Sequence, residues 1–182
     1  MAKESEDVSQ IYRLLDQVEG PIFLHVNQRW NRAALNRLFA LLTLMGGATF
    51  SLLVSAAIGF FAPGHWSTAG WQALAAVALS HVPVFLAKRS APRKRPYQIY
   101  PQATTGRSPL KDPSFPSGHT TAGFAMLTPW MIAEPLLIPL LLPIAVGIGL
   151  SRIYFGLHFP SDTLAGALLG SATAMLVSLW IV

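Results

Sequence analysis

Long stretches without charged side chains alternate with short polar segments along the 182 residues of the chain. A helix needs about 20 apolar residues to cross the roughly 30 Å hydrocarbon core of a bilayer. The uncharged stretches cover about 38–62, 70–87, 118–133, 136–150 and 163–182. The pattern therefore predicts an all-α, polytopic membrane helical bundle with about five transmembrane helices, four or six being the alternatives.

The boundary between the third and fourth stretches lies at Glu134 and Pro135. Both stretches are short, so a single long helix is the alternative. The residue before a proline is disfavoured in the α-helical conformation, and we therefore expect a tight turn at this point.

Residues 1–35 have a different pattern. Apolar side chains recur at helical spacing among acidic and basic ones, at Ile11, Leu14, Leu15 and Val18. This spacing predicts an amphipathic helix that lies in the membrane interface, with a solvated helix packed on the membrane domain as the alternative. The membrane domain then comprises residues 36–182.

The composition narrows the class of protein further. Hydrophobic residues make up 52% of the chain and charged residues only 12%, whereas an ordinary soluble domain is about a quarter charged. A cytosolic enzyme and a disordered chain are both disfavoured. The chain has no cysteine, which excludes a disulfide scaffold.

The loop 88–117 carries seven of the 13 Lys and Arg residues and is rich in proline. Taken alone, it would be a juxtamembrane patch that binds anionic lipid headgroups. Three polar clusters change that interpretation. They are Lys88 with Arg95-Pro96, then Pro116-Ser117-Gly118-His119, then Ser151-Arg152 with His158 and Asp162.

Each cluster alone has a structural explanation, such as a helix cap at Ser117 or Asp162. The alternation of spans, however, places all three clusters on one face of the membrane. Ionisable residues at membrane depth are costly and indicate function.

The residue types fit the chemistry of phosphate. The Lys and Arg side chains can surround the anion, and guanidinium groups bind its oxygens in pairs. Ser117 and Gly118, at a helix start, offer a hydroxyl and backbone N–H groups. One of His119 and His158 can attack phosphorus while the other protonates the leaving oxygen. Asp162 is close enough in sequence to orient the ring of His158.

In order and spacing, Lys-x6-Arg-Pro, Pro-Ser-Gly-His and Ser-Arg-x5-His-x3-Asp resemble the motifs of the type 2 phosphatidic acid phosphatase superfamily. That superfamily comprises lipid phosphatases, vanadium haloperoxidases and bacterial acid phosphatases. The resemblance implies a helical bundle and metal-independent hydrolysis through a phosphohistidine. Many membrane members have six spans, whereas here the amphipathic segment stands in place of the first.

The resemblance also implies a role for each matching residue. His158 would be the nucleophile, His119 the general acid and Asp162 the orienting carboxylate. The phosphate ligands would be Lys88, Arg95, Ser117, Gly118, Ser151 and Arg152.

We therefore expect an integral-membrane lipid phosphatase that acts on a phosphomonoester or diphosphate of a membrane lipid. Candidate substrates are phosphatidic acid, phosphatidylglycerol phosphate and polyprenyl diphosphates. We expect no cofactor, no metal and no nucleic acid partner. The alternatives are a metal-binding protein, which the neighbouring cations disfavour, a catalytically silent lipid-binding relative, and a haloperoxidase, whose known relatives are soluble.

The distribution of charge predicts the side of the membrane. With five spans, all 13 Lys and Arg lie on the face that carries the three clusters, and ten remain when Lys88, Arg95 and Arg152 are discounted. The positive-inside rule then places the active site on the cytoplasmic face of the cell membrane. Bacterial relatives often place this site outside, so an external phosphatase that recycles polyprenyl diphosphate is the alternative.

Overall fold

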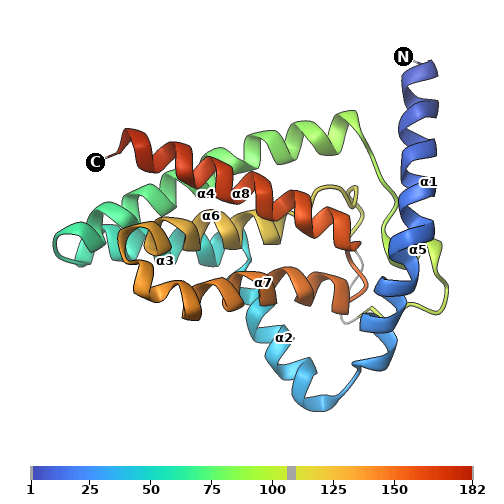
Figure 1. Ribbon diagram of the computed structural model, residues 1–182, viewed down its shortest axis with the longest axis horizontal. Coiled ribbons are helices and arrows are strands. Elements are labelled where there is room, and N and C mark those ends of the chain that lie inside the picture. The colour runs from blue at the N-terminus through green and yellow to red at the C-terminus, as the bar shows by residue number, and fades with distance from the viewer. Residues whose placement is uncertain (1, 106–109, 182) are drawn as a thin grey trace.

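In a computed structural model of the protein, residues 2–105 and 110–181 are described, with side chains from residue 10 onward. Every regular element in this part is a helix, which confirms the all-α prediction (Figure 1). The elements are α1 (Ala2–Leu24), the π-helical turn η1 (His25–Arg29), α2 (Ala33–Met45), α3 (Ala48–Phe61), α4 (His65–Ser90), α5 (Pro96–Ile99), α6 (Gly118–Ala133), the 3₁₀ turn η2 (Pro135–Leu137), α7 (Ile138–Tyr154) and α8 (Pro160–Trp180).

Helix α6 is the centre of the bundle, with α3, α4, α7 and α8 around it (Figure 1). Small residues make part of its contacts, and Ala122 and Ala125 are fully buried against the neighbouring helices beside the larger Met126 and Trp130. Small side chains let helix backbones approach closely, which is how helices associate without a hydrophobic driving force in lipid.

The stretch expected as one span over 38–62 is two helices, α2 and α3, which meet at an angle of 62°. The break lies at Gly46 and Gly47. A Cβ atom at Gly46 would lie 2.9 Å from the backbone oxygen of His119 and would clash with Ile148. Since only glycine fits there, α2 can end directly against α6 and α7.

Among the described residues, three helical segments are long and apolar enough to cross a membrane, namely α4, η2 with α7, and α8, and the bent pair α2–α3 would be a fourth. The expected third span, α6, has 16 residues and rises about 24 Å, less than the hydrocarbon core. Helix α8 begins at Pro160, three residues before the expected start, so that Asp162 lies inside its first turn.

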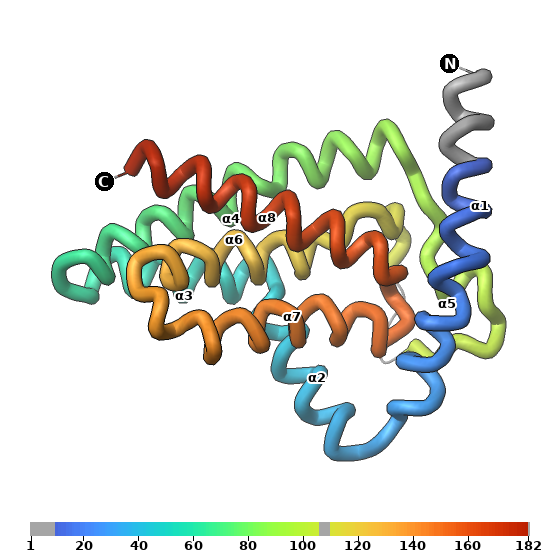
Figure 2. The backbone as a smooth tube through the Cα atoms, viewed as in Figure 1, coloured from blue at the N-terminus to red at the C-terminus, as the bar shows by residue number. Residues whose placement is uncertain are grey.

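Helix α1 runs across one end of the bundle, crosswise to the other helices (Figure 2). Most of its apolar side chains face outward, with Leu14 63% and Val18 72% exposed, whereas Glu19 and the apolar Phe23 are buried against the rest of the chain. In a soluble protein the apolar face would point inward. The observed arrangement suits an interfacial helix whose apolar face meets lipid.

Candidate active site

The three polar clusters meet at the end of the bundle that α1 crosses (Figure 1). The backbone N–H of Ser117 donates to the backbone oxygen of Asp162 at 3.0 Å, which joins the second cluster to the third. The guanidinium Nη1 of Arg95 lies 3.2 Å from Nε2 of His158, which joins the first. The convergence expected from the topology is thus present in the fold.

The cations of the first cluster are bridged by a carboxylate that the motifs do not contain. Asp112 accepts a hydrogen bond from Lys88 Nζ at 2.8 Å and another from Arg95 Nη2 at 2.9 Å. Burial alone would raise the pKa of Asp112, but its hydrogen bond to Lys88 and the charges of Arg95 and Lys88 hold it below its usual value. Asp112 is therefore ionised at neutral pH and holds both cations at the site.

His158 is buried between a carboxylate and a cation. Its Nδ1 lies 3.6 Å from Oδ2 of Asp162, and its Nε2 faces Arg95. Burial lowers the pKa of His158 to about 4, and the charges of Arg152 and Arg95 lower it as well. The hydrogen bond and the charge of Asp162 act in the opposite direction but do not offset these effects. The imidazole is therefore neutral at pH 7, and one of its ring nitrogens has a free electron pair.

The carboxylate of Asp162 has several donors besides His158. Ser114 Oγ donates to Oδ2 of Asp162 at 2.5 Å and also lies 3.4 Å from Nδ1 of His158. The backbone N–H of Phe159 donates to the same oxygen at 2.8 Å, as an acidic residue in the first turn of a helix does. Oδ1 of Asp162 accepts from Arg93 at 3.0 Å.

The Pro-Ser-Gly-His cluster forms the start of α6. Ser117 is the N-cap, and its Oγ accepts a hydrogen bond from the backbone N–H of Thr120 at 3.4 Å. His119 follows in the first turn, is partly buried, and interacts electrostatically with Arg152 and His158. The charges of both histidines therefore interact with that of Arg152.

Ser151 and Arg152 lie at the end of α7 and are both buried. Ser151 is buried and its Oγ donates to the backbone oxygen of Ile148 at 2.6 Å. Arg152 Nη1 donates to Thr43 Oγ1 at 2.6 Å, whereas its Nε is buried and has no hydrogen-bond partner within the described part of the chain. Arg152 thus keeps donor capacity for a ligand.

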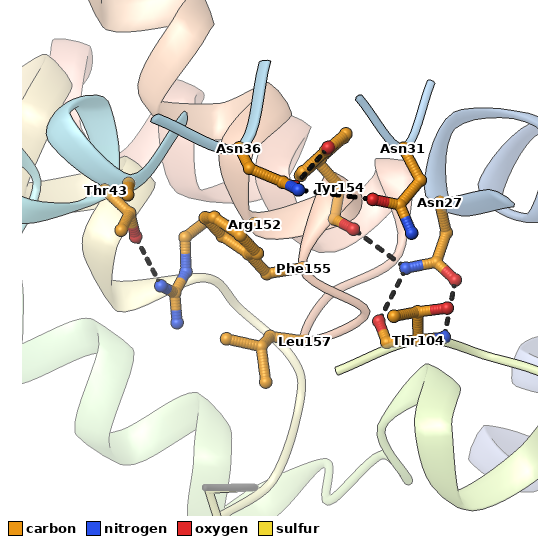
Figure 3. Close-up of a pocket in the computed structure, with 10 residues that line it drawn as sticks. Asn27, Asn31, Asn36, Thr43, Thr104, Arg152, Tyr154, Phe155 and Leu157 are labelled. Atoms are coloured by element: carbon orange, nitrogen blue, oxygen red, sulfur yellow. Dashed lines mark hydrogen bonds between the residues drawn. The ribbon is translucent and has the colours of Figure 1, made fainter. Parts of the chain in front are cut away.

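A cavity of about 520 Å³ opens beside Arg152 (Figure 3). Asparagine and threonine side chains from η1, α2 and the loop before α6 line it, together with aromatic residues at the end of α7. Asn27 fixes one wall because it exchanges two hydrogen bonds of 2.8 Å with Thr104 and donates a third to the Tyr154 oxygen. Gly156 has a φ of 71°, and a Cβ there would lie 2.8 Å from the Thr104 oxygen.

Three side chains at the site occupy none of the defined motif positions, namely Arg93, Asp112 and Ser114. The sequence placed them in the basic loop, and their only signal was that this loop joins two of the motif clusters. Among the described residues, no three His, Cys, Asp or Glu side chains are grouped so that they could hold a metal ion.

Several curated proteins are similar to part of this chain. The lipid A 1-phosphatase of Rhizobium johnstonii is 29% identical over 98 residues, which is 52% of this chain and 40% of the relative. The decaprenylphosphoryl-5-phosphoribose phosphatase of Mycobacterium tuberculosis is 33% identical over 114 residues, or 62% of this chain and 59% of that enzyme. The matches thus span about half of the length of these relatives.

Two solved structures resemble the whole chain. The crystal structure of LpxE from Aquifex aeolicus superposes with a TM-score of 0.79 at 27% identity, covering 90% of this chain and 95% of that one. A transmembrane PAP2-type phosphatidylglycerolphosphate phosphatase from Bacillus subtilis has a TM-score of 0.74 at 22% identity, covers 97% of this chain and 95% of its own, and supports the fold alone.

The apolar helices and these relatives identify a multi-pass membrane protein. Residues 69–182, more than half of the chain, match the PAP2 superfamily. That region contains all three motif clusters, as the resemblance of the motifs to the type 2 phosphatidic acid phosphatases had implied. The chain therefore belongs to the PAP2 superfamily.

Proposed function

We propose that this protein is a membrane lipid phosphatase that hydrolyses a phosphomonoester or diphosphate through a phosphohistidine. One observation carries the proposal most strongly. The neutral, buried imidazole of His158 has Asp162 behind one ring nitrogen and the Arg95 guanidinium beside the other. A nucleophile oriented by a carboxylate and facing a cationic phosphate site is the arrangement that covalent phosphoryl transfer requires.

The proposed reaction has two steps. In the first, Nε2 of His158 attacks phosphorus, the bond from phosphorus to the leaving oxygen breaks, and His119 gives that oxygen a proton. Asp162 stabilises the positive charge that forms on the His158 ring. In the second, His119 removes a proton from water, the water oxygen attacks phosphorus, and the bond from phosphorus to nitrogen breaks to release phosphate.

The phosphate would lie among the Lys and Arg side chains, where it competes with the Asp112 carboxylate for Lys88 and Arg95. Arg152, with its unpartnered Nε, would hold the phosphate from the other side. The adjoining cavity gives room for the polar part of a lipid headgroup. The named substrates of the relatives are lipids that carry phosphate, which supports a lipid substrate here.

The direct test is phosphate release from lipids dispersed in detergent micelles. The panel comprises phosphatidic acid, phosphatidylglycerol phosphate, a polyprenyl monophosphate and a polyprenyl diphosphate. We expect turnover of at least one of them by the wild-type protein. A protein that folds and inserts but hydrolyses none of them would contradict the proposal.

We expect activity to survive EDTA and to be inhibited by vanadate. The guanidinium and ammonium groups already supply the positive charge that a metal ion would bring, and trigonal-bipyramidal vanadate resembles the transferring phosphoryl group. The measurement is the rate of phosphate release with and without each compound. Activity that disappears with EDTA and returns with Mg²⁺ or Zn²⁺ would rule out the proposed mechanism.

We propose that the active site faces the cytoplasm. Residues 91–105, residues 110–117 and the turn 155–159 lie at the same end of the bundle, and α8 ends at the other (Figure 1). Of the cations that decide the charge count, Arg107 and the side chain of Lys3 lie outside the described residues. The remaining excess of Lys and Arg on the face with the three clusters supports the orientation that the positive-inside rule predicts.

This orientation can be tested in the naturally cysteine-free chain by the Thr105→Cys variant. We expect an impermeant maleimide to leave Cys at this position unmodified in intact cells and to modify it after permeabilisation. A cysteine replacing Trp180, which is 86% exposed near the C-terminus, is the matched control and should show the opposite pattern. Labelling of Thr105→Cys in intact cells would place the site outside.

A further inference from the structure

We infer that Arg93 is a positioning residue for the pair His158–Asp162, and that α1 holds Arg93 in place through Asp16 and Glu19. The inference rests on the proposed function, because it concerns the same site. It assigns a role to a side chain that occupies none of the defined motif positions and to a helix outside the region that matches the family.

Arg93 determines which oxygen of Asp162 faces the histidine. Its Nη1 donates to Oδ1 of Asp162 at 3.0 Å, so that Oδ2 is the oxygen that turns toward His158 and Ser114. Rotation of the carboxylate would break the contact with Arg93 on one side and the contacts with His158 and Ser114 on the other. The guanidinium thus fixes the orientation of the group that orients the nucleophile.

The position of Arg93 is itself fixed by the chain around it. Its side chain is 1% exposed, and its guanidinium lies 4.0 Å from the centre of the Phe159 ring and 5.0 Å from that of Tyr12. Cations are held well over aromatic faces. This leaves the guanidinium little freedom to follow Asp162 if the carboxylate turns.

Helix α1 supplies the opposing charges. Arg93 Nη2 donates to carboxylate oxygens of both Asp16 and Glu19, one turn apart on the polar face of α1. Glu19 also accepts from the backbone N–H and the hydroxyl of Ser161, at 2.8 and 2.9 Å. Ser161 directly precedes Asp162. Helix α1 therefore contacts the segment that carries Asp162 in two ways, through Arg93 and through the hydroxyl and backbone N–H of Ser161.

The charge of Arg93 and those of the carboxylates around it depend on one another. One cation faces three carboxylates, and the side chains of Arg93, Glu19 and Asp162 are at most 7% exposed. Burial alone would lower the pKa of Arg93, but Asp162, Glu19 and Asp16 raise it above its usual value. Removing the cation would leave buried carboxylates to repel one another, which is strongly unfavourable.

The test compares variants of the full chain in detergent–lipid micelles, with phosphate release from a lipid substrate as the assay. Arg93→Gln is expected to lower kcat about 10- to 100-fold with KM changed less than about threefold, since a misplaced catalytic group costs rate rather than affinity. Arg93→Lys keeps the charge and should recover part of the loss. Lys94→Gln removes the same charge from the exposed neighbouring residue and should stay close to wild type.

A second variant separates positioning from folding. Glu19→Gln leaves Arg93 paired with Asp162 but weakens the link to α1, and we expect a smaller fall in kcat, with an unchanged elution profile and thermal midpoint. A purely structural role would instead lower the thermal midpoint of both variants without changing the kcat of the folded fraction. That result would overturn the inference.

Four other outcomes decide the inference. An Arg93→Gln variant with the kcat of wild type would overturn the inference while leaving the proposed function intact, and so would a rise in KM alone, which would make Arg93 a substrate-binding residue. An equal loss in Lys94→Gln would show that the effect comes from the overall charge of the loop and would also overturn the inference. A wild-type protein inactive on every lipid of the panel would overturn the proposed function, and this inference with it.

Discussion

The His158→Ala variant is expected to release phosphate at no more than about a thousandth of the wild-type rate, because removal of a nucleophile leaves only binding and electrostatic stabilisation. Nε2 of His158 is the nitrogen that faces the cationic site, next to Arg95. No other described histidine has a carboxylate behind its ring. Among the described residues, no second histidine is therefore oriented to take over the attack.

The measurement is lipid phosphate release by protein shown to be folded by its elution profile in detergent. His25, which is exposed in η1, provides the matched control, and His25→Ala should behave as wild type. Asp162→Asn should lose much of the rate but less than His158→Ala, since the nucleophile itself remains. Retention of even a tenth of the wild-type rate by His158→Ala would show that the assignment is wrong.

The second large effect is expected for His119→Ala, and its size should depend on the leaving group. A general acid contributes about 10²- to 10⁴-fold when the leaving oxygen needs a proton. An alkoxide released from a lipid needs one, whereas the phenolate released from p-nitrophenyl phosphate does not. In the first step, His119→Ala should therefore lose nearly all activity on a lipid phosphate and far less on the aryl ester, which would appear as a burst of p-nitrophenolate. The second step, in which His119 is the base, should be slow for both substrates.

His158→Ala provides the contrast within the same assay, because loss of the nucleophile should affect both substrates equally. If the burst of p-nitrophenolate were lost in His119→Ala to the same extent as lipid hydrolysis, His119 would act in binding or in the nucleophilic step, and its role as the general acid would have to be abandoned.

The motif residues could be found from the sequence because each carries a chemical signature at a fixed spacing. Arg95, Ser117 and His158 are of types that bind or attack phosphate, and the alternation of apolar stretches was enough to bring them to one end of the bundle. The hydrophobic pattern also predicted the helices that surround α6, apart from their ends.

Contacts between distant segments could not be found in the same way. The bend at Gly46 depends on His119 and Ile148, which lie far along the chain, and nothing in the local pattern distinguishes it from a continuous span. Arg93 was one of seven cations in a basic loop, and its importance depends on a pairing with α1 that joins residues 74 and 77 positions apart. The surplus of Lys and Arg predicts which face of the membrane the loop occupies. It does not predict which carboxylate each cation pairs with.

The contacts of α1 bear on what counts as the smallest working unit of this protein. The part of the chain shared with the family begins at residue 69, yet the carboxylates that hold Arg93, the asparagine that walls the cavity and the threonine that meets Arg152 all precede it. The region shared with the family is thus smaller than the region whose side chains hold the site together. A fragment that begins at residue 69 would keep every motif residue. It would lose the side chains that fix the positions of Arg93, Arg152 and the cavity wall.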